Sequence, residues 1–400
     1  MTFSDVRDSV IRPLAIFFCA LTCLFSLGPT QFQLSAIGAI TVIFSLMLSP
    51  SGYWNEIREK GIAALLFVVL IAMGYYFSAF PPKSIKGGWE LFRSLFVFFA
   101  GGVLLSRSSE KQTMSAFFRA SWVAVIILVG LYFWSISQWE WRWSLRNNGV
   151  LSELISGIHE YANVAAMCLL VAACAVMYDR QYRTPAVWAL LVILVGILVV
   201  SDSRGAYAAL LFCGLLALGW WKKPFFYMFW AASLGLIVAM VWVSFFHQGD
   251  IFLGYTIPPS FMERIILYQG TWSAFLDKPW LGYGLNSFKF APDLIGGGLD
   301  QVMPHNIYLE ILFSVGLVGT TVLVVACALL LKGSVNQGAD APRLLLYRSG
   351  VLLFAYLQFR GLTELHLNYK VYVALFLSIA LIHAGGRSET TSSGKQATLN

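Results

Sequence analysis

Charged residues are scarce in this chain of 400 residues. Asp, Glu, Lys and Arg together make up 12% of it, hydrophobic residues make up 58%, and the mean hydropathy is +0.72. A water-soluble domain usually carries about 25% charged residues. The composition therefore excludes an ordinary soluble globular protein and indicates a polytopic membrane protein.

Cysteines and nucleotide-binding signatures are missing from the segments between the apolar runs. The six cysteines all lie inside those runs: Cys19, Cys23, Cys168, Cys174, Cys213 and Cys327. This placement excludes a disulfide framework and a cysteine-rich metal site. The segment Gly282-Tyr283-Gly284 lacks the third glycine of a dinucleotide fingerprint, and we interpret it as a turn. We expect no nucleic-acid partner.

Windows of about 20 apolar residues, enough to cross the hydrocarbon core of a membrane, predict an all-α fold with about 12 transmembrane helices. They cover residues 12–27, 31–49, 61–79, 88–106, 120–137, 155–178, 186–201, 204–221, 225–246, 305–331, 344–363 and 368–384. We expect helices 1–9 in residues 1–246, one larger loop at 247–304, helices 10–12 in 305–384 and a disordered tail at 385–400. The first span lacks a small-residue cleavage site, so we expect it to remain in the protein.

Most of the 27 Lys and Arg residues fall in connections that share a side with both termini. Because cytoplasmic loops retain positive charge, we expect both termini in the cytoplasm. The opposite side nevertheless keeps basic residues in or beside its loops: Lys83, Lys86, Arg142, Arg146, Arg204, Arg264, Lys278 and Lys289. This excess predicts an anionic ligand on that side.

Residues 247–304 form the one long polar stretch. Within it, Phe261 to Phe275 has the spacing of an amphipathic helix that lies on the bundle surface. On such a helix Arg264 would lie close to the membrane surface. It either binds an anion there or only marks the interface, as a snorkelling arginine does.

Arg204 lies in the tight connection between two apolar spans, flanked by the small residues Ser203 and Gly205. An arginine near the end of a membrane helix is unfavourable unless it reaches water or an anion. Its position predicts a bound phosphate or carboxylate. The alternative is an anchoring role.

His305 follows Pro304, where the polar stretch meets the next apolar helix. The positive end of a helix dipole favours the neutral imidazole, which is the form that accepts a proton. The alternative is an ordinary capping or interface hydrogen bond, and this is how we interpret the other four histidines.

These sites belong to short motifs in a fixed order. They are Ser203-Arg204-Gly205-Ala206; Glu263-Arg264, followed by Trp272 and Asp277-Lys278-Pro279-Trp280-Leu281-Gly282-Tyr283-Gly284-Leu285-Asn286-Ser287-Phe288; and His305-Asn306-Ile307-Tyr308-Leu309-Glu310 with Gly316-Leu317-Val318-Gly319 downstream. In this order and spacing, over residues 201–319, the chain resembles the O-antigen ligases and the related O-antigen polymerases and protein O-oligosaccharyltransferases of bacterial envelopes. The motifs do not separate ligase from polymerase.

The resemblance implies a GT-C-like glycosyltransferase of the bacterial inner membrane, with its active site facing the periplasm. The donor would be O antigen on undecaprenyl diphosphate, and the acceptor of a ligase would be a sugar hydroxyl of lipid A core. The residues fit that chemistry. Arg204 and Arg264 supply planar, permanently charged guanidinium groups for the leaving diphosphate. His305 can take the proton of the acceptor hydroxyl as it attacks, which gives inversion at the anomeric carbon in a single displacement.

Other residues of the motifs, Lys278, Asn306 and Tyr308, are expected to bind substrate. Arg142 and Arg146, in a tryptophan-rich segment, can reach lipid phosphates or the glycan, or serve only at the membrane interface.

Carboxylates are scattered singly in the loops of this side. We therefore predict an enzyme that needs no metal ion or other cofactor. Glu310 lies about 140° round a helix from His305, so we expect it to serve packing or capping.

Three functions remain open: a ligase, a polymerase that uses lipid-linked glycan as both donor and acceptor, and a transporter of lipid-linked glycan. A transporter would place charges at mid-span and show paired broken helices. Polar residues here gather at one surface, which favours an enzyme. The short chain, the modest loop and the single helix pair after His305 favour a ligase.

Overall fold

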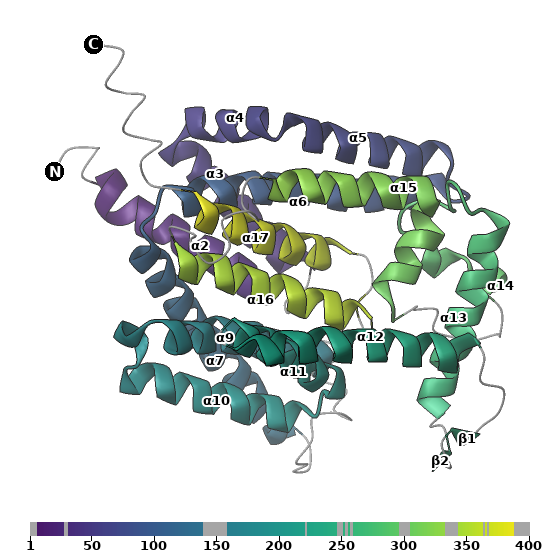
Figure 1. Ribbon diagram of the computed structural model, residues 1–400. Helices are drawn as coiled ribbons and strands as arrows, with labels where there is room; N and C mark the ends of the chain where they lie inside the picture. Colours follow the sequence, from purple (N-terminus) through teal and green to yellow (C-terminus); the bar gives the residue numbers. More distant parts are fainter. Residues whose placement is uncertain are drawn as a thin grey trace.

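The computed structural model describes residues 6–27, 31–138, 158–220, 222–245, 251–252, 255–256, 259–295, 305–332, 343–362, 365 and 368–387. They form a bundle of long helices that run roughly side by side (Figure 1). The helical elements are η1 (Arg7–Ile11), α2 (Arg12–Leu24), α3 (Gln31–Leu48), α4 (Pro50–Glu59), α5 (Gly61–Tyr76), α6 (Pro81–Ser106), α7 (Glu110–Gln138), α9 (Ile158–Tyr178), η3 (Arg180–Tyr182), α10 (Pro185–Ser201), α11 (Arg204–Gly219), α12 (Lys223–Phe245), α13 (Pro259–Asp277), η4 (Phe288–Phe290), α14 (Pro292–Ile295), α15 (Ile307–Leu331), α16 (Leu344–Gly361) and α17 (Tyr369–Gly386). Two short strands, β1 (Ile251–Phe252) and β2 (Tyr255–Thr256), pair antiparallel.

Each window predicted to span the membrane is occupied by a helix, because apolar runs without helix breakers favour one. Among the described helices, 5 are long and apolar enough to cross a membrane, namely α6, α7, α9, α15 and α17. A sixth span results if α3 and α4, which meet at an angle of 108°, are counted together. Helices α5, α10 and α11 are apolar but shorter. The chain is therefore a polytopic membrane protein, and the count of about 12 spans stays a prediction.

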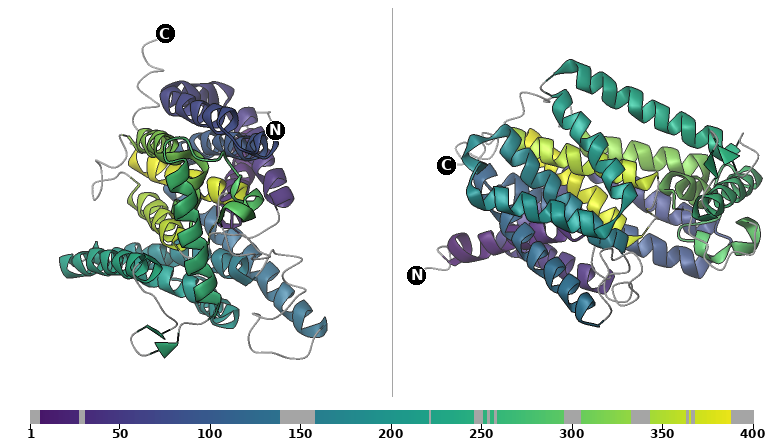
Figure 2. Two further views of the ribbon diagram at one scale, coloured as in Figure 1. Left: turned by 90° about the vertical axis from the view of Figure 1, so that its right-hand side faces the viewer. Right: turned by 90° about the horizontal axis from the view of Figure 1, so that it is seen from below.

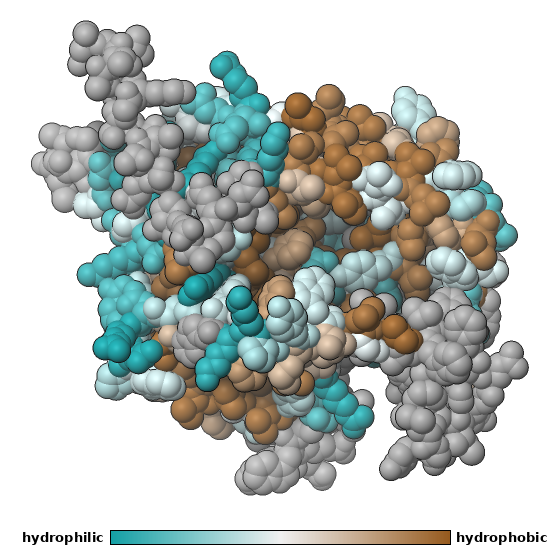
Figure 3. All heavy atoms as spheres, in the orientation of Figure 1, coloured by the Kyte–Doolittle hydropathy of each residue, from teal (hydrophilic) through white to brown (hydrophobic). Residues whose placement is uncertain are grey.

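The outer surface of the bundle suits lipid. Large apolar side chains stand exposed along the helices, as Ile62 (71%), Val192 (70%) and Leu211 (65%) show. On the face drawn in Figure 3, hydrophobic residues cover much of the middle of the bundle, whereas hydrophilic residues gather towards one end. Such an apolar surface is too large for a soluble monomer and matches a hydrocarbon environment.

α17 is the central helix and is buried along almost its whole length between α6 and α16. Glycines let these helices approach closely. A Cβ atom on Gly101 of α6 would lie 2.7 Å from a methyl carbon of Leu377, and one on Gly350 of α16 would lie 2.7 Å from the backbone nitrogen of Ile382. Membrane helices pack tightly through such small residues, because lipid supplies no hydrophobic drive for association.

The two ends of the bundle differ, as Figures 1 and 2 show. At one end, here called the terminal end, η1 begins and α17 finishes. At the opposite end, here called the loop end, α13 and α14 lie beside the ends of the long helices, and the β1–β2 pair projects away from the bundle. The α10–α11 connection and the start of α15 also lie at the loop end.

α15 is broken at Gly316, whose backbone angles (φ 62°, ψ −169°) are not helical. The loop after α13 lies against the break. There the backbone N–H of Leu317 donates to the carbonyl of Pro279 (2.8 Å), and that of Val318 donates to the carbonyl of Trp280 (3.1 Å). The loop therefore satisfies donors that the break deprives of their helical partners.

The same loop also returns hydrogen bonds to the first half of α15. The N–H groups of Tyr283 and Gly284 donate to the carbonyls of Phe313 (2.9 Å) and Ser314 (2.7 Å). The rings of Tyr283 and Phe313 stack with centroids 4.7 Å apart, within a small second core that also contains Phe288. The first half of α15 is thus joined to the loop by backbone hydrogen bonds and by ring packing.

Candidate active site at the loop end of the bundle

Arg204 is the first residue of α11, directly after the turn that closes α10. Asp202 adopts the left-handed conformation (φ 46°) in this turn, and its small neighbours Ser201 and Ser203 are buried. The hydroxyl of Tyr207 donates to the carbonyl of Leu198 at 2.7 Å, which ties the start of α11 to the end of α10. The tight connection predicted from the sequence is confirmed, and it holds an exposed arginine at the loop end.

His305 lies just before the cap of α15. The helix begins at Ile307, two residues later than the predicted start of this span, and Asn306 is its N-cap. The side-chain carbonyl of Asn306 accepts hydrogen bonds from the N–H groups of Tyr308 (3.0 Å) and Leu309 (3.2 Å). His305 itself has φ 48°, a conformation that a residue other than glycine rarely adopts. The cap therefore holds the histidine at the helix terminus, outside the helix.

Arg264 lies on α13, so a helix is present where the sequence predicted one. Leu267 and Thr271 of this helix are buried, whereas Ile266 and Trp272 are exposed.

Tyr268 follows Arg264 by one helical turn and therefore lies on the same side of α13. Its hydroxyl lies 3.5 Å from the carbonyl oxygen of Leu362, the residue that follows α16. Arg264 thus lies on a helix whose face meets the end of α16.

The last turn of α16 and its C-cap, residues 358–362, contact all the helices that carry these three residues. On α15, Tyr308 donates its hydroxyl to the side chain of Gln358 at 2.7 Å, and Ile307 packs so closely on Gly361 that an added Cβ would lie 2.5 Å from its methyl group.

Phe359 of the same turn reaches α11, where its ring stacks on Phe212 with centroids 4.2 Å apart. Arg204 lies two helical turns before Phe212, about 12 Å further along α11, and therefore beyond the end of α16. The third contact is with α13, where the hydroxyl of Tyr268 meets the carbonyl of Leu362. The end of α16 thus contacts each of the helices that carry Arg204, Arg264 and His305, which the sequence did not reveal.

Arg360 of this turn is fully buried and belongs to a polar network that the sequence analysis missed. Its Nε donates to the side-chain oxygen of Asn163 on α9 at 2.8 Å, and the hydroxyl of Tyr356 donates to the same oxygen at 2.8 Å. A buried arginine inside a membrane bundle is tolerated only when such partners surround it. The network therefore fixes the position of α16 along α9 and its rotation about its own axis.

Buried charges also lie where α17 begins. Lys370 pairs with Glu160 of α9 at 2.6 Å, and the carboxylate of Glu90 on α6 accepts the backbone N–H of Tyr369 at 3.1 Å. Glu310, in the first turn of α15, is buried as well. These polar residues occur singly within apolar runs and belong to no sequence motif. The sequence indicates their importance only in that a charged residue lies within a predicted membrane span.

The remaining predicted residues divide into two groups. Lys278 is exposed and lies over the ring of Tyr283, with its ammonium 4.7 Å from the ring centroid, so it lies at the edge of the loop. Arg142 and Arg146 lie outside the described residues. In the part of the chain that the structure describes, no group of three or more His, Cys, Asp and Glu is placed to hold a metal ion.

Together these features define an integral membrane protein with an arginine- and histidine-bearing site at one end of a helical bundle. Residues 189–324 match the O-antigen ligase family. The matched segment contains Arg204, Arg264 and His305. No curated protein matches the chain. The match suggests a ligase- or polymerase-type activity.

Proposed function

We propose that the protein is an O-antigen ligase: it transfers O antigen from undecaprenyl diphosphate to a sugar hydroxyl of lipid A core and so produces lipopolysaccharide. One observation carries the proposal. Within the segment that matches the family, two arginines and a histidine lie on α11, on α13 and just before α15, and the parts of these elements that carry them lie at the same end of the bundle.

The two arginines bind the diphosphate of the donor. Arg204 is exposed at the first residue of α11 and Arg264 is half-buried on α13. A guanidinium keeps its charge at any physiological pH and offers paired donors that match phosphate oxygens. As the bond between the anomeric carbon and the diphosphate breaks, negative charge grows on the leaving oxygen, and fixed cations stabilise it.

His305 acts as the general base. It takes the proton from the acceptor hydroxyl while that oxygen attacks the anomeric carbon from the side opposite the diphosphate. The new carbon–oxygen bond forms as the old one breaks, so the configuration inverts and undecaprenyl diphosphate leaves with the electron pair. The histidine then gives its proton to water. No step requires a metal ion.

Asn306 and Tyr308 support this arrangement. The side-chain oxygen of Asn306 caps α15, and Tyr308 binds Gln358, so both keep His305 in place; contact with substrate would come in addition. Lys278 and the two arginines Arg142 and Arg146 are proposed to meet the glycan or the lipid phosphates further out.

The proposed setting is the bacterial inner membrane, with about 12 spans in a GT-C-like arrangement. The loop end faces the periplasm, where both substrates are present, and the terminal end faces the cytoplasm. Polymerase activity is the second candidate, because the family contains both reactions and the site chemistry is the same for each.

The choice of acceptor separates these two functions. Purified protein in lipid nanodiscs is given undecaprenyl-diphosphate-linked glycan, with or without lipid A core, in excess EDTA. A ligase forms a glycan–core product only when the core is present and leaves the lipid-linked glycan at its original length. Elongation of the lipid-linked glycan without core would instead identify a polymerase, and a requirement for added Mg²⁺ would refute the metal-independent mechanism.

A further inference from the structure

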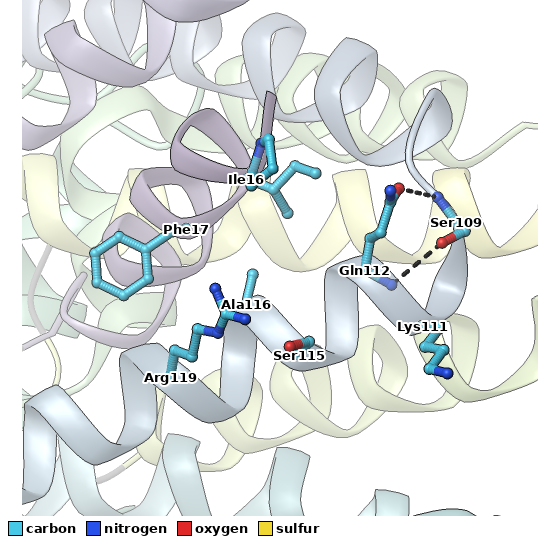
Figure 4. A pocket seen from close by; sticks show the side chains of 9 residues that line it. Ile16, Phe17, Ser109, Lys111, Gln112, Ser115, Ala116 and Arg119 are labelled. Atoms are coloured by element: carbon cyan, nitrogen blue, oxygen red, sulfur yellow. Dashed lines mark hydrogen bonds between the residues drawn. The ribbon is translucent and has the colours of Figure 1, made fainter. Parts of the chain in front are cut away.

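A groove of about 470 Å³ opens between α2 and α7 at the terminal end, far from the proposed active site. Its volume lies within the range of small-molecule sites, roughly 300–1,000 Å³. The groove is shown in Figure 4 and is lined by Pro13, Ile16, Phe17, Ser109, Lys111, Gln112, Ser115, Ala116 and Arg119.

One wall of the groove is cationic. Lys111, Ser115 and Arg119 follow one another at intervals of four residues and therefore form a single stripe along α7. Arg119 extends towards Phe17 of α2, and Lys111 stands nearer the start of α7 (Figure 4). Both cations are exposed, and within the described ranges neither forms an ion pair. This wall can accept an anion without breaking an existing pair.

Acidic residues near this wall are engaged elsewhere. Glu110 precedes Lys111, but its carboxylate receives backbone N–H groups of Leu345 and Leu346 at the start of α16. Asp8 pairs with Arg12 at 2.9 Å. The lining itself contains two cations and no carboxylate, so the groove is selective for negative charge.

The other wall is apolar. Pro13, Ile16 and Phe17 have the spacing of one face of α2, and Ile16 is buried while Phe17 is partly exposed. Ala116 continues this surface on α7. An occupant must therefore present an anionic group to α7 and hydrocarbon to α2.

We propose that this groove binds an anionic phospholipid. The phosphate lies beside the guanidinium of Arg119 and the hydroxyl of Ser115, Lys111 closes the groove towards the start of α7, and an acyl chain lies along Ile16 and Phe17. Basic pockets between membrane helices bind anionic head groups in this way. The site is separate from the transfer reaction and does not depend on its assignment.

Lipid retention by the intact protein tests the proposal. The full chain is purified in a mild detergent and titrated with phosphatidylglycerol or phosphatidylcholine, and bound lipid is counted by native mass spectrometry. The double variant Lys111→Gln/Arg119→Gln should bind phosphatidylglycerol at least tenfold more weakly than the parent and should bind phosphatidylcholine unchanged. The matched control, Lys222→Gln/Lys223→Gln, removes two exposed cations outside the groove and should bind phosphatidylglycerol like the parent.

A steric variant separates lipid from free phosphate. Ser115→Phe keeps both cations but fills the groove, so it should lose phosphatidylglycerol. Inorganic phosphate should not displace the lipid from the parent at low millimolar concentration, because it lacks the apolar part. The proposal is overturned if the double variant retains phosphatidylglycerol, if Ser115→Phe binds it like the parent, or if phosphate alone competes fully.

Discussion

The backbone N–H of Leu317 donates to the carbonyl of Pro279 across 2.8 Å, and this bond joins two motifs that lie far apart in the sequence. It belongs to a set in which the loop after α13 exchanges hydrogen bonds with both sides of the break in α15. The part of α15 that carries His305 at its start is thereby attached to the helix that carries Arg264. The relative position of His305 and Arg264, the proposed base and the proposed ligand of the donor's diphosphate, depends on this exchange.

The first prediction concerns Gly282, which has φ 66° and faces the break. A Cβ atom there would lie 2.6 Å from the carbonyl oxygen of Phe313 and 2.7 Å from the nitrogen of Gly316. Replacement by Ala should lower the free energy of unfolding by about 2 kcal/mol or more, since left-handed backbone and backbone clash both oppose it, and it should abolish glycan transfer. Thermal unfolding in detergent and a transfer assay measure the two effects.

Gly196→Ala is the matched control for this variant. Gly196 is helical, and a Cβ there would meet nothing within 4 Å. The substitution should leave transfer unchanged and raise stability by up to about 1 kcal/mol. If Gly282→Ala and Gly196→Ala had equal stability and equal transfer activity, the contact between the loop and the break in α15 would not be needed for either.

The second prediction concerns the buried network of α9 and α16. Tyr356→Phe removes one hydrogen bond to Asn163 and should destabilise the protein by about 1 kcal/mol. Asn163→Leu removes the acceptor of both Tyr356 and the charged Arg360 and should destabilise it by about 3 kcal/mol. Asn163→Asp keeps the acceptor and should preserve most of the stability. Unfolding midpoints rank the three variants; an Asn163→Leu protein as stable as Tyr356→Phe would show that the contact to Arg360 is unimportant.

The apolar runs were sufficient to predict where the helices lie, because a long stretch of apolar residues has few other ways to be stable in lipid. The motifs likewise indicated Arg204, Arg264 and His305. The exchange between residues 279–284 and the break at Gly316 could not be predicted, because its bonds are made by backbone groups that every sequence possesses.

The same limit applies to the last turn of α16. Gln358, Phe359 and Gly361 are ordinary residues in an apolar run, and only the packing shows that Gln358 and Gly361 contact α15 whereas Phe359 contacts α11. Asn306 is predicted to bind substrate, which stays a prediction; the structure shows that its side-chain oxygen caps α15. An asparagine just before an apolar run is typical of a helix N-cap. The sequence alone does not distinguish such an asparagine from one that binds substrate.

The third prediction concerns orientation. Ser273 is exposed on α13 at the loop end, and Gln181 is exposed in the α9–α10 connection at the terminal end. In intact cells, Ser273→Cys should react with a membrane-impermeant thiol reagent from the periplasm and Gln181→Cys should not. Five of the native cysteines are buried and Cys327 is partly buried, so the background should be low. The reverse labelling pattern would place the proposed site in the cytoplasm.

The most direct measurement compares donor binding with glycan transfer in variants of the three site residues, all checked for folding in the membrane. If His305 is the base, His305→Ala should bind undecaprenyl-diphosphate-linked glycan nearly as the parent does and lose transfer by about 100-fold or more. Arg204→Lys and Arg264→Lys should each lose both binding and transfer, because an ammonium keeps the charge but loses the paired donors. Substantial transfer by His305→Ala, or donor binding by Arg264→Lys equal to that of the parent, would contradict the account.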